Sequence, residues 1–514
     1  MQRRDFLIQL AAAAGVAAGF GESPRRSLGR GAVGKTLATA KEYGLLECPN
    51  LSLLGALRKS RTGILTCTIN DQTHCADTGQ KWGRVSWLND LYFGLQGGVF
   101  IGGEHQHEVF RKELRKIAQH VQVGPGRPPV PYTVSADGRD AKFNPDGGFD
   151  LDRCAEFILE VVRIYEMTGD RAFAFDLYPK CVEVVDYLAA RDLDGDLLLE
   201  GRTESFTDPP GRGVGACSSL TYIGDTTANT WKDFGASLFY YEALQKLALL
   251  ESILGMKDEG VQRLRRAARV REAIKQILWN SKTDGFLAWV EKNGTPHDDW
   301  ITGNNLHAVA CGLADRTQSV LILKKLENHR QEIEEVVPCR VRIGVFEDGL
   351  CSNRPDYYWN GGIWPLVSAP DMRARGLMGD VTGALHVADL LATRPKVTDT
   401  GFFEAYDGKT GAPNDCAGLL MNNGGFLWGF FEGVLGMEVR GDELRLRASV
   451  AKSILPAKAR IHYRGADLEL LWTIGLRPSA SLDKESIPLS GGGYYQLKLM
   501  PEPERTYRVE IKVL

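Results

Sequence analysis

Amphipathic helical segments separated by long connections recur through most of this chain, and this recurrence constrains the fold more than any other feature. Residues 151–168 are typical: apolar side chains return every three or four positions, and Gly169 follows the last turn. Comparable segments are predicted at residues 88–100, 104–121, 174–191, 232–254, 259–280, 302–314, 316–330, 360–375, 380–393 and 424–435. Because long and short connections alternate, the sequence predicts helical hairpins whose long loops carry the function.

The composition excludes several classes of protein. The chain has 514 residues, 43% of them hydrophobic and 25% charged, with 62 basic and 65 acidic residues and a net charge of −3. This apolar content excludes a disordered chain. Near-neutral charge gives no electrostatic reason to expect a nucleic acid or an anionic membrane surface as a partner. No apolar run of about 18 residues follows the N-terminal region, which excludes a multi-spanning membrane protein.

Residues 1–22 have the features of an export signal. Arg3 and Arg4 precede an apolar run, rich in Ala and Gly, that starts at Phe6. This pattern resembles a bacterial twin-arginine signal; a surface helix or an N-terminal membrane anchor is the alternative interpretation. We therefore expect a periplasmic or secreted protein without membrane contact once the signal is removed.

Ten cysteines in a chain of this length are too sparse for a disulfide scaffold. Cys67 and Cys75 are close enough in sequence to pair, whereas Cys154 falls within a helical apolar pattern, where a buried free thiol is expected. The chain has no CxxC motif, and His105 and His107 would not share one face of a helix. The sequence predicts no metal site and no cofactor.

Three segments follow the export signal. Residues 40–86 are an N-terminal lead of mixed character with short strands near 63–69, and residues 87–436 hold the helical segments. From Met437 onward the pattern changes to the alternation of β-strands, as in LRLRASV and DLELLWTI. Residues 437–514 are therefore predicted to form a small antiparallel β domain.

The long loops concentrate tryptophans and carboxylates. One loop reads DLDGDLLLEGRTESFTDPPG, a second reads NRPDYYWNGGIWP and a third reads GFFEAYDGKTG. Sugar rings stack on aromatic side chains, and cleavage of a glycosidic bond needs two carboxyl groups in different protonation states. Acidic residues in such loops are ordinarily turn formers, and DLDGD lacks the full spacing of an EF-hand. It is the combination of carboxylates with tryptophans that indicates a sugar site.

The order of these segments resembles that of the six-hairpin glycosidases, which have an (α/α)6-barrel fold and include trehalases, family 63 α-glucosidases, family 78 rhamnosidases and family 94 phosphorylases. YEMTGD with the following DLDGDLLLEGR, then YYWNGGIWP, then NNGGFLWGFFEGVLGMEV are similar to segments found in this order in those barrels. The resemblance covers about residues 87–436. It implies a mainly α fold, an (α/α)6 barrel followed by the β domain, and an exported glycoside hydrolase that acts on an oligosaccharide or another glycoside.

The resemblance also implies two catalytic residues. In trehalase-like and family 63 enzymes the general acid ends a Glu-Ser-Gly-Trp-Asp motif; residues 204–208 keep the Glu, Ser and Asp but lose the Gly and Trp, which makes Asp208 the implied acid. The general base lies in a Phe-x-Glu-Tyr-Tyr-like segment before Pro-x-Thr-Gly, and residues 402–411 match it with Glu404. Asp208 would stay protonated, Glu404 would activate water, and a separation of about 6.5–9.5 Å would give inversion.

Further residues are implied around this pair. The expected substrate-binding residues are Asp90, Arg202, Glu204, Trp231, Trp359, Asn360 and Trp364. Asp90 in WLNDLYFG, Arg202 and Asn360 would bind hydroxyls, and the tryptophans would stack on sugar rings. Glu204, Asp225 and Asp233 compete with Asp208 as the acid, because WKDFGASLFYYEAL resembles the helix that follows the acid loop.

Other functions on the same scaffold remain open from the sequence. A sugar phosphorylase would use phosphate in place of activated water and would need no base, which the well-matched Glu404 segment disfavours. A non-catalytic carbohydrate-binding barrel would explain the altered motif at residues 204–208. A polysaccharide lyase would need a Tyr/His pair that we do not place in the sequence.

Overall fold

Twelve α-helices run between residues 51 and 428 in the described part of the computed structural model, and each of the eleven predicted segments overlaps one of them. The structure describes residues 42–69, 72–76, 80, 86–124, 128–135, 137–143, 151–201, 221–224, 227, 229–346, 349–490, 492–499, 502 and 504–514. The helices are α3 (Leu51–Cys67), α4 (Leu88–Gly98), α5 (Gly103–His120), α6 (Leu151–Thr168), α7 (Arg171–Ala189), α8 (Phe234–Leu254), α9 (Lys257–Ile277), α10 (Thr302–Ala310), α11 (Arg316–Glu332), α12 (Ser368–Leu377), α13 (Val381–Thr393) and α14 (Leu420–Trp428).

The helix α3 lies where the sequence predicted mixed structure with short strands. The strand prediction near residues 63–69 is wrong as far as Cys67; only Thr68–Ile69 (β2) is extended, and it pairs with Gln72–Thr73 (β3). Gly55 and Gly63 weaken the helical signal, because glycine is a poor helix former. Gly63 is nevertheless needed, since a Cβ there would lie 2.2 Å from the carbonyl oxygen of Thr400.

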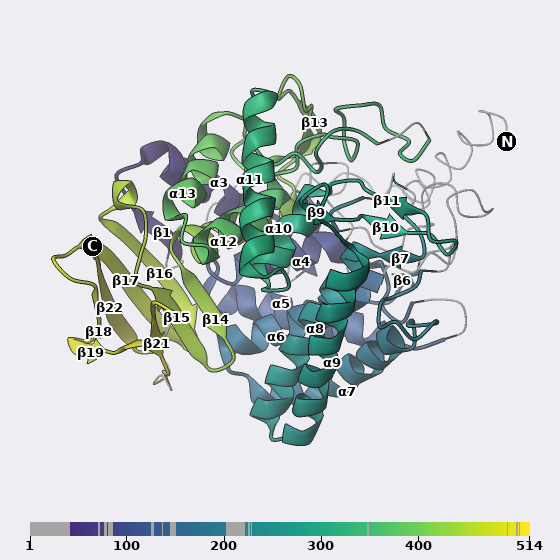
Figure 1. Ribbon diagram of the computed structural model, residues 1–514. Helices are drawn as coiled ribbons and strands as arrows, with labels where there is room; N and C mark the ends of the chain where they lie inside the picture. Colours follow the sequence, from purple (N-terminus) through teal and green to yellow (C-terminus); the bar gives the residue numbers. More distant parts are fainter. Residues whose placement is uncertain are drawn as a thin grey trace, which may run out of the picture. The chain divides into compact units, whose positions relative to one another are not determined.

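The six even-numbered helices contact one another in a continuous cycle. α4 contacts α6, α6 contacts α8, and the contacts continue through α10 and α12 to α14, which returns to α4. The odd-numbered helices pack on these helices: α3 contacts α14, and α7 and α9 both contact α8. In Figure 1 α10 lies beside α11, and α12 lies beside α13.

Glycines allow the first and last helices of this cycle to touch through their backbones. A Cβ on Gly97 of α4 would lie 2.2 Å from the carbonyl oxygen of Gly424, and a Cβ on Gly424 would lie 2.1 Å from that of Phe93. Such distances are far below any carbon–oxygen contact, so the α4–α14 contact requires glycine at both positions. The Gly-rich stretches GLQGG and NNGG therefore have a packing role.

Two short hairpin turns combine a left-handed glycine with an aspartate N-cap. Gly169 has a φ of +66° and Gly379 a φ of +85°, conformations that glycine adopts without steric cost. The next residue begins the following helix: Asp170 accepts a hydrogen bond from the backbone of Phe173, and Asp380 accepts one from Gly383. The Gly-Asp pair thus reverses the chain from α6 into α7 and from α12 into α13.

Strands from Met437 onward form two sheets. The four-stranded sheet has the order β14-β15-β21-β20, and the six-stranded sheet has the order β1-β16-β17-β22-β18-β19. These strands are β14 (Met437–Arg440), β15 (Glu443–Arg447), β16 (Ala457–Tyr463), β17 (Ala466–Ile474), β18 (Ser479–Leu482), β19 (Glu485–Ile487), β20 (Leu489–Ser490), β21 (Tyr494–Leu497), β22 (Thr506–Val513) and, from the N-terminal lead, β1 (Gly44–Glu47). In Figure 1 the purple β1 lies beside the yellow-green β16.

The C-terminal sheets differ from the predicted small antiparallel β domain of residues 437–514 in two respects, although most of their strand pairs are antiparallel. β17 and β22 pair in parallel, and the edge strand β1 comes from residues far away in sequence. Alternating apolar residues identify a strand with one buried face, but they carry no information about the direction of its partner. β1 contacts both β16 and α3, so tertiary packing places it at the edge of the sheet.

Short strands line the loops between the helices. They are β4 (Ser86–Trp87), β5 (Thr133–Val134), β6 (Ala141–Lys142), β7 (Lys232–Asp233), β8 (Trp279–Asn280), β9 (Gly285–Phe286), β10 (Trp289–Val290), β11 (Pro296–His297), β12 (Phe403–Tyr406) and β13 (Pro413–Ala417). Residues 365–367 and 452–454 form 3-10 turns, and residues 429–434 continue α14 as a π-helix.

The predicted export signal at residues 1–22 lies outside the described residues. Of the helices that the structure describes, none is long and apolar enough to cross a membrane. The nine cysteines in the described part of the chain are present as thiols, Cys67 and Cys75 among them, and Cys154 is buried as the sequence predicts.

Candidate active site

Glu404 lies on the hairpin formed by β12 and β13, just before α14. The amide nitrogen of Asn422, in the first turn of α14, donates hydrogen bonds of 2.7 Å to the carbonyl oxygens of both Phe403 and Glu404. The amide oxygen of Asn422 accepts a bond from the backbone of Leu366. One side chain therefore ties the Glu404 backbone to α14 and to the segment that leads into α12, and Glu404 itself is only 5% exposed.

Two side chains hold the carboxylate of Glu404. The hydroxyl of Tyr358 donates a hydrogen bond of 2.8 Å to Oε1, and the thiol of Cys416 lies 3.6 Å from Oε2 and donates to it. Sequence reasoning did not identify either residue. Tyr358 stands in the YYWNGGIWP segment that was singled out for its tryptophans, and Cys416 lies on the strand opposite Glu404. Each carboxylate oxygen thus has a donor that orients it.

We expect the Tyr358→Phe variant to fold normally and to lose about tenfold in kcat, because a hydrogen bond to a charged group is removed from the carboxylate. Removal of the Tyr358 hydrogen bond also destabilises the charged form of Glu404. The acidic limb of the pH–activity profile should therefore move to higher pH. The matched control is Tyr357→Phe, because the Tyr357 ring faces Arg354 at 4.6 Å. Equal profiles for the two variants would contradict a positioning role for Tyr358.

Asp90 lies in the first turn of α4 and is 8% exposed. Burial is the largest cause that raises the pKa of this carboxyl, to about 8, and the negative charge of Glu404 raises it further, while Arg153 acts in the opposite direction. The interaction shows that the fold brings Asp90 and Glu404 into one electrostatic environment. At neutral pH the Asp90 carboxyl is therefore largely protonated.

We expect the Asp90→Asn variant to be more stable than the wild type at pH 8, by up to about 5 kcal/mol. Between about pH 4 and pH 8 the folded wild type keeps a proton on Asp90 that the unfolded chain has lost, so its stability falls as the pH rises. The variant lacks this dependence. Urea unfolding at pH 5 and pH 8 measures the difference, with the exposed Asp399→Asn as control; an unchanged slope in the Asp90 variant would contradict the burial of this ionisable group.

Trp359 and Trp364 stack on each other instead of facing an open cleft. Their ring centroids are 4.1 Å apart at an angle of 15°, and Tyr358 packs edge-on against Trp364 at 5.0 Å. Both tryptophans are buried, and Gly224 lies so close that a Cβ there would stand 2.1 Å from the Trp359 ring. The two residues are close to Tyr358 and hence to Glu404, but each offers one ring face to the other.

Asn360 and Trp231 also have partners within the protein. The side chain of Asn360 accepts a hydrogen bond from the backbone of Phe346 and donates one to the carbonyl oxygen of Asn353. Trp231 is buried, and the ammonium group of Lys292 lies 4.9 Å from its ring centroid. These contacts fix the loops on which the two residues stand.

The loop that carries the predicted acid is outside the described residues. Asp208, Arg202, Glu204 and Asp225 all fall there, so the Asp208–Glu404 separation remains a prediction. Asp233, another competitor for the acid, caps α8 by accepting a hydrogen bond of 2.8 Å from the backbone of Ala236. That role accounts for an aspartate at this position.

The start of α6 is held by an acid–base network that includes Arg153. The backbone and hydroxyl of Thr221 donate hydrogen bonds of 2.8 and 2.6 Å to Asp152. The Thr221 hydroxyl also lies 2.6 Å from Glu156, whose carboxylate pairs with Arg153 at 2.5 Å. Since Arg153 also acts on Asp90, this network links α6 to the Asp90–Glu404 region.

The acidic stretch DLDGDLLLE folds around a lysine. Asp192, Asp194 and Glu200 bring carboxylate oxygens within 4.8 Å of one another. The ammonium group of Lys232 is 2.7 Å from Asp194 and 3.7 Å from Glu200, and it also bonds Asp196. The lysine offsets part of the negative charge of the cluster, and this arrangement gives the stretch a structural role in the loop before α8.

Comparison with known proteins gives an independent finding. Residues 217–428 match the family model of the mannosylglycerate hydrolase MGH1-like glycoside hydrolase domain. The matched segment includes Glu404, Tyr358 and Asn422 and begins after Asp208.

Solved structures share the fold. A family 78 rhamnosidase from Bacillus sp. GL1 is 15% identical with a TM-score of 0.58, over 92% of this chain and 44% of that one. The family 63 mannosylglycerate hydrolase from Thermus thermophilus, in complex with glucose, is 16% identical with a TM-score of 0.55, over 73% of this chain and 99% of that one. The chain thus spans less than half the length of the rhamnosidase. Together with the family model, these structures confirm the resemblance to the six-hairpin glycosidases.

Proposed function

We propose that this chain, a relative of the six-hairpin glycosidases, is an exported glycoside hydrolase that cleaves its substrate with inversion of the anomeric centre. The observation that carries the proposal is the environment of Glu404: a buried carboxylate with a donor on each oxygen, in the segment that resembles the general-base motif. A base that attacks through water must be held in one orientation, and two donors achieve this.

The (α/α)6 barrel is part of the same proposal. It is supported by the continuous cycle of contacts among α4, α6, α8, α10, α12 and α14, with the odd-numbered helices packed against it. On this proposal the barrel runs from Leu51 to Val434, because α3 supplies the twelfth helix, and the strands from Met437 onward are a separate β domain.

The proposed reaction uses two carboxyl groups with different tasks. Asp208, the last residue of the altered Glu-Ser-Phe-Thr-Asp motif, donates a proton to the leaving oxygen as the glycosidic bond breaks. Glu404 accepts a proton from the water that forms the new bond on the opposite face of the sugar. The water oxygen becomes the anomeric hydroxyl, and the two carboxyls exchange protons with solvent before the next turnover.

Asp90 is proposed to bind the sugar beside Glu404. A carboxyl whose pKa is raised to about 8 is largely protonated at neutral pH and can donate a hydrogen bond to a hydroxyl oxygen, as well as accept one. Arg202 and Glu204 remain proposed hydroxyl partners from the acid loop. For Trp359 and Trp364, mutual stacking favours a supporting role behind Tyr358, and a sugar would meet only the ring face or edge that the pair leaves uncovered.

Export is proposed from the sequence of residues 1–22 alone, and it implies a periplasmic or secreted enzyme. The test is fractionation of a bacterial host that expresses the full chain, with Arg3→Lys/Arg4→Lys as the comparison. Retention of the paired-lysine variant in the cytoplasm is expected, because the twin arginines are the part of the signal that the receptor reads. Equal export of both proteins would contradict the twin-arginine route.

The activity is tested by incubating the purified protein with a panel of aryl glycosides, with and without inorganic phosphate. We expect release of the aryl alcohol from at least one glycoside at a rate that does not depend on phosphate, and loss of that release in the Asp208→Asn variant. Dependence on phosphate would indicate a phosphorylase. Binding of sugars without any cleavage would indicate a carbohydrate-binding protein, and either result would overturn the proposal.

A further inference from the structure

A second site is indicated by a charged cavity away from Glu404. The cavity has a volume of about 140 Å³ and is lined by residues from the middle or second half of several even-numbered helices, together with residues of β14. Gln96 on its wall lies six residues after Asp90 along α4, about 9 Å along the helix axis. The lining residues do not include Glu404, Asp90 or the residues that hydrogen-bond Glu404, namely Tyr358, Cys416 and Asn422.

Four basic and four acidic side chains dominate its wall. They are Arg163, Lys246, Arg373, Arg440, Glu166, Glu242, Glu432 and Glu438. Such a wall does not hold an apolar ligand, because charged groups must keep polar partners. The volume equals that of about five water molecules at liquid density, or of a small organic molecule with about six heavy atoms and one or two waters.

Most of these charges are paired with one another. Arg163 lies 2.7 Å from Glu432, and Lys246 lies 2.8 Å from Glu166. Glu242 lies 2.7 Å from the ring of His307, which is itself fully buried. These pairs form the rigid part of the wall and leave their groups little capacity to bind a guest.

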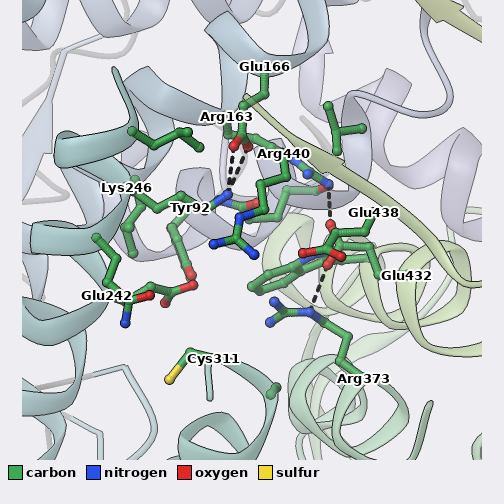
Figure 2. Close-up of a pocket in the computed structure, with 17 residues that line it drawn as sticks. Tyr92, Arg163, Glu166, Glu242, Lys246, Cys311, Arg373, Glu432, Glu438 and Arg440 are labelled. Atoms are coloured by element: carbon green, nitrogen blue, oxygen red, sulfur yellow. Dashed lines mark hydrogen bonds and ion pairs between the residues drawn. The ribbon is translucent and has the colours of Figure 1, made fainter. Parts of the chain in front are cut away.

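Two guanidinium groups keep unused donors, in addition to that of Arg163, whose buried Nε also has no hydrogen-bond partner among the described residues. Arg373 bonds Glu432 through Nε at 2.8 Å and stacks over Trp428 at 4.0 Å, but its buried Nη1 has no hydrogen-bond partner in the part of the chain that the structure describes. Arg440, at the end of β14, makes no ion pair or side-chain hydrogen bond with the described residues. In Figure 2 both guanidinium groups point toward the open middle of the cavity.

One carboxylate on the wall is likewise not paired within the described chain. The side chain of Glu438, two residues before Arg440 on β14, has neither an ion pair nor a hydrogen bond with the described residues. An occupant must therefore present an acceptor to the two guanidinium groups and a donor to a carboxylate.

We propose that the cavity binds a small organic carboxylate that also carries a hydroxyl group. Its carboxylate would accept hydrogen bonds from Arg373 Nη1 and Arg440, the arrangement in which guanidinium groups bind carboxylates best. Its hydroxyl would donate to Glu438. A phosphate dianion fits less well, because it would bring two negative charges among Glu242, Glu432 and Glu438; a metal cation would meet four basic side chains.

This inference does not rest on glycoside hydrolysis, because its readout is binding. Isothermal titration of the full-length protein at pH 7 with glycolate, lactate and 3-hydroxybutyrate should give saturable binding for at least one of them. Propionate and propane-1,2-diol are the matched probes for lactate, since each lacks one of its two groups. We expect the best hydroxy acid to bind about tenfold or more tightly than either probe.

Three variants locate the site. Arg440→Gln should weaken binding about tenfold or more, because it removes a charged donor from an exposed position where folding is not at risk. Glu438→Gln should reduce the preference for lactate over propionate. Arg477→Gln, which removes the same charge from an exposed position outside the cavity, should change nothing.

Four results would overturn the proposal: no saturable binding of any hydroxy acid, unchanged binding by Arg440→Gln, equal binding of propane-1,2-diol, or tighter binding of inorganic phosphate. In the first case the basic side chains would serve only to neutralise the acidic groups and the carbonyl ends of the helices.

Discussion

The Glu404→Gln variant should fold like the wild type and lose about a thousandfold or more in kcat/KM on any glycoside that the wild type cleaves. The amide keeps the size of the side chain and can still accept the hydrogen bond from Tyr358. It cannot take a proton from water, so the attack on the sugar loses its base. The comparison uses steady-state rates with an aryl glycoside, together with thermal unfolding to verify the fold.

A second variant distinguishes a base from a residue that only binds substrate. In Glu404→Ala the side chain is removed, and azide should restore bond cleavage because it attacks without needing to be deprotonated. Glu485→Gln, on the C-terminal sheet and exposed, is the control for a change of charge. Turnover within tenfold of the wild type in Glu404→Gln, or an absence of azide rescue in an otherwise folded Glu404→Ala, would remove Glu404 from the proposed mechanism.

The Gly97→Ala variant should lose about 3 kcal/mol or more of its free energy of unfolding. The added methyl group would meet the backbone of Gly424, with its carbonyl oxygen at 2.2 Å, and backbone cannot rotate away as a side chain can. The contact between α4 and α14 joins the first and last of the even-numbered helices, so the two helices must separate to admit the methyl. Asp90 and Asn422 stand on these same helices, and activity should fall with stability.

The control for this variant is Gly55→Ala in α3. No atom of the described residues lies within 4 Å of the position that a Cβ would take there, so the substitution should stabilise the helix by about 0.5–1 kcal/mol. Urea unfolding of both variants gives the comparison. Similar small effects at the two positions would show that the α4–α14 contact is looser than the backbone distances indicate.

Helical periodicity was sufficient to predict eleven of the twelve helices in the described part of the chain, because each buries an apolar stripe. It failed at α3, where Gly63 interrupts the pattern to let the helix approach Thr400 and Asn423, a requirement set by residues more than 300 positions away. The parallel pairing of β22 was missed for a similar reason. Alternation along a strand reports which face is buried, and the partner and its direction are set by tertiary contacts.

The candidate site likewise has residues that the sequence predicted and residues that it did not. Motif resemblance selected Glu404, Asp90 was a candidate hydroxyl-binding residue, and the structure brings these two into one electrostatic environment. The sequence did not indicate Cys416 or Tyr358 as partners of Glu404, because hydrogen bonds across a hairpin and between loops depend on three-dimensional placement. Trp359 and Trp364 were predicted to face a sugar, but residues five apart in a loop can also fold back on each other, as these do.

The central claim, hydrolysis with inversion by a water that Glu404 activates, is tested most directly by the configuration of the first sugar released. Proton NMR recorded during the first minutes of hydrolysis of a cleaved aryl glycoside resolves the two anomers before they interconvert. We expect the anomer opposite to that of the substrate. Release of the anomer with the same configuration would contradict the claim, because it requires a covalent or otherwise double displacement in which Glu404 does not act through water.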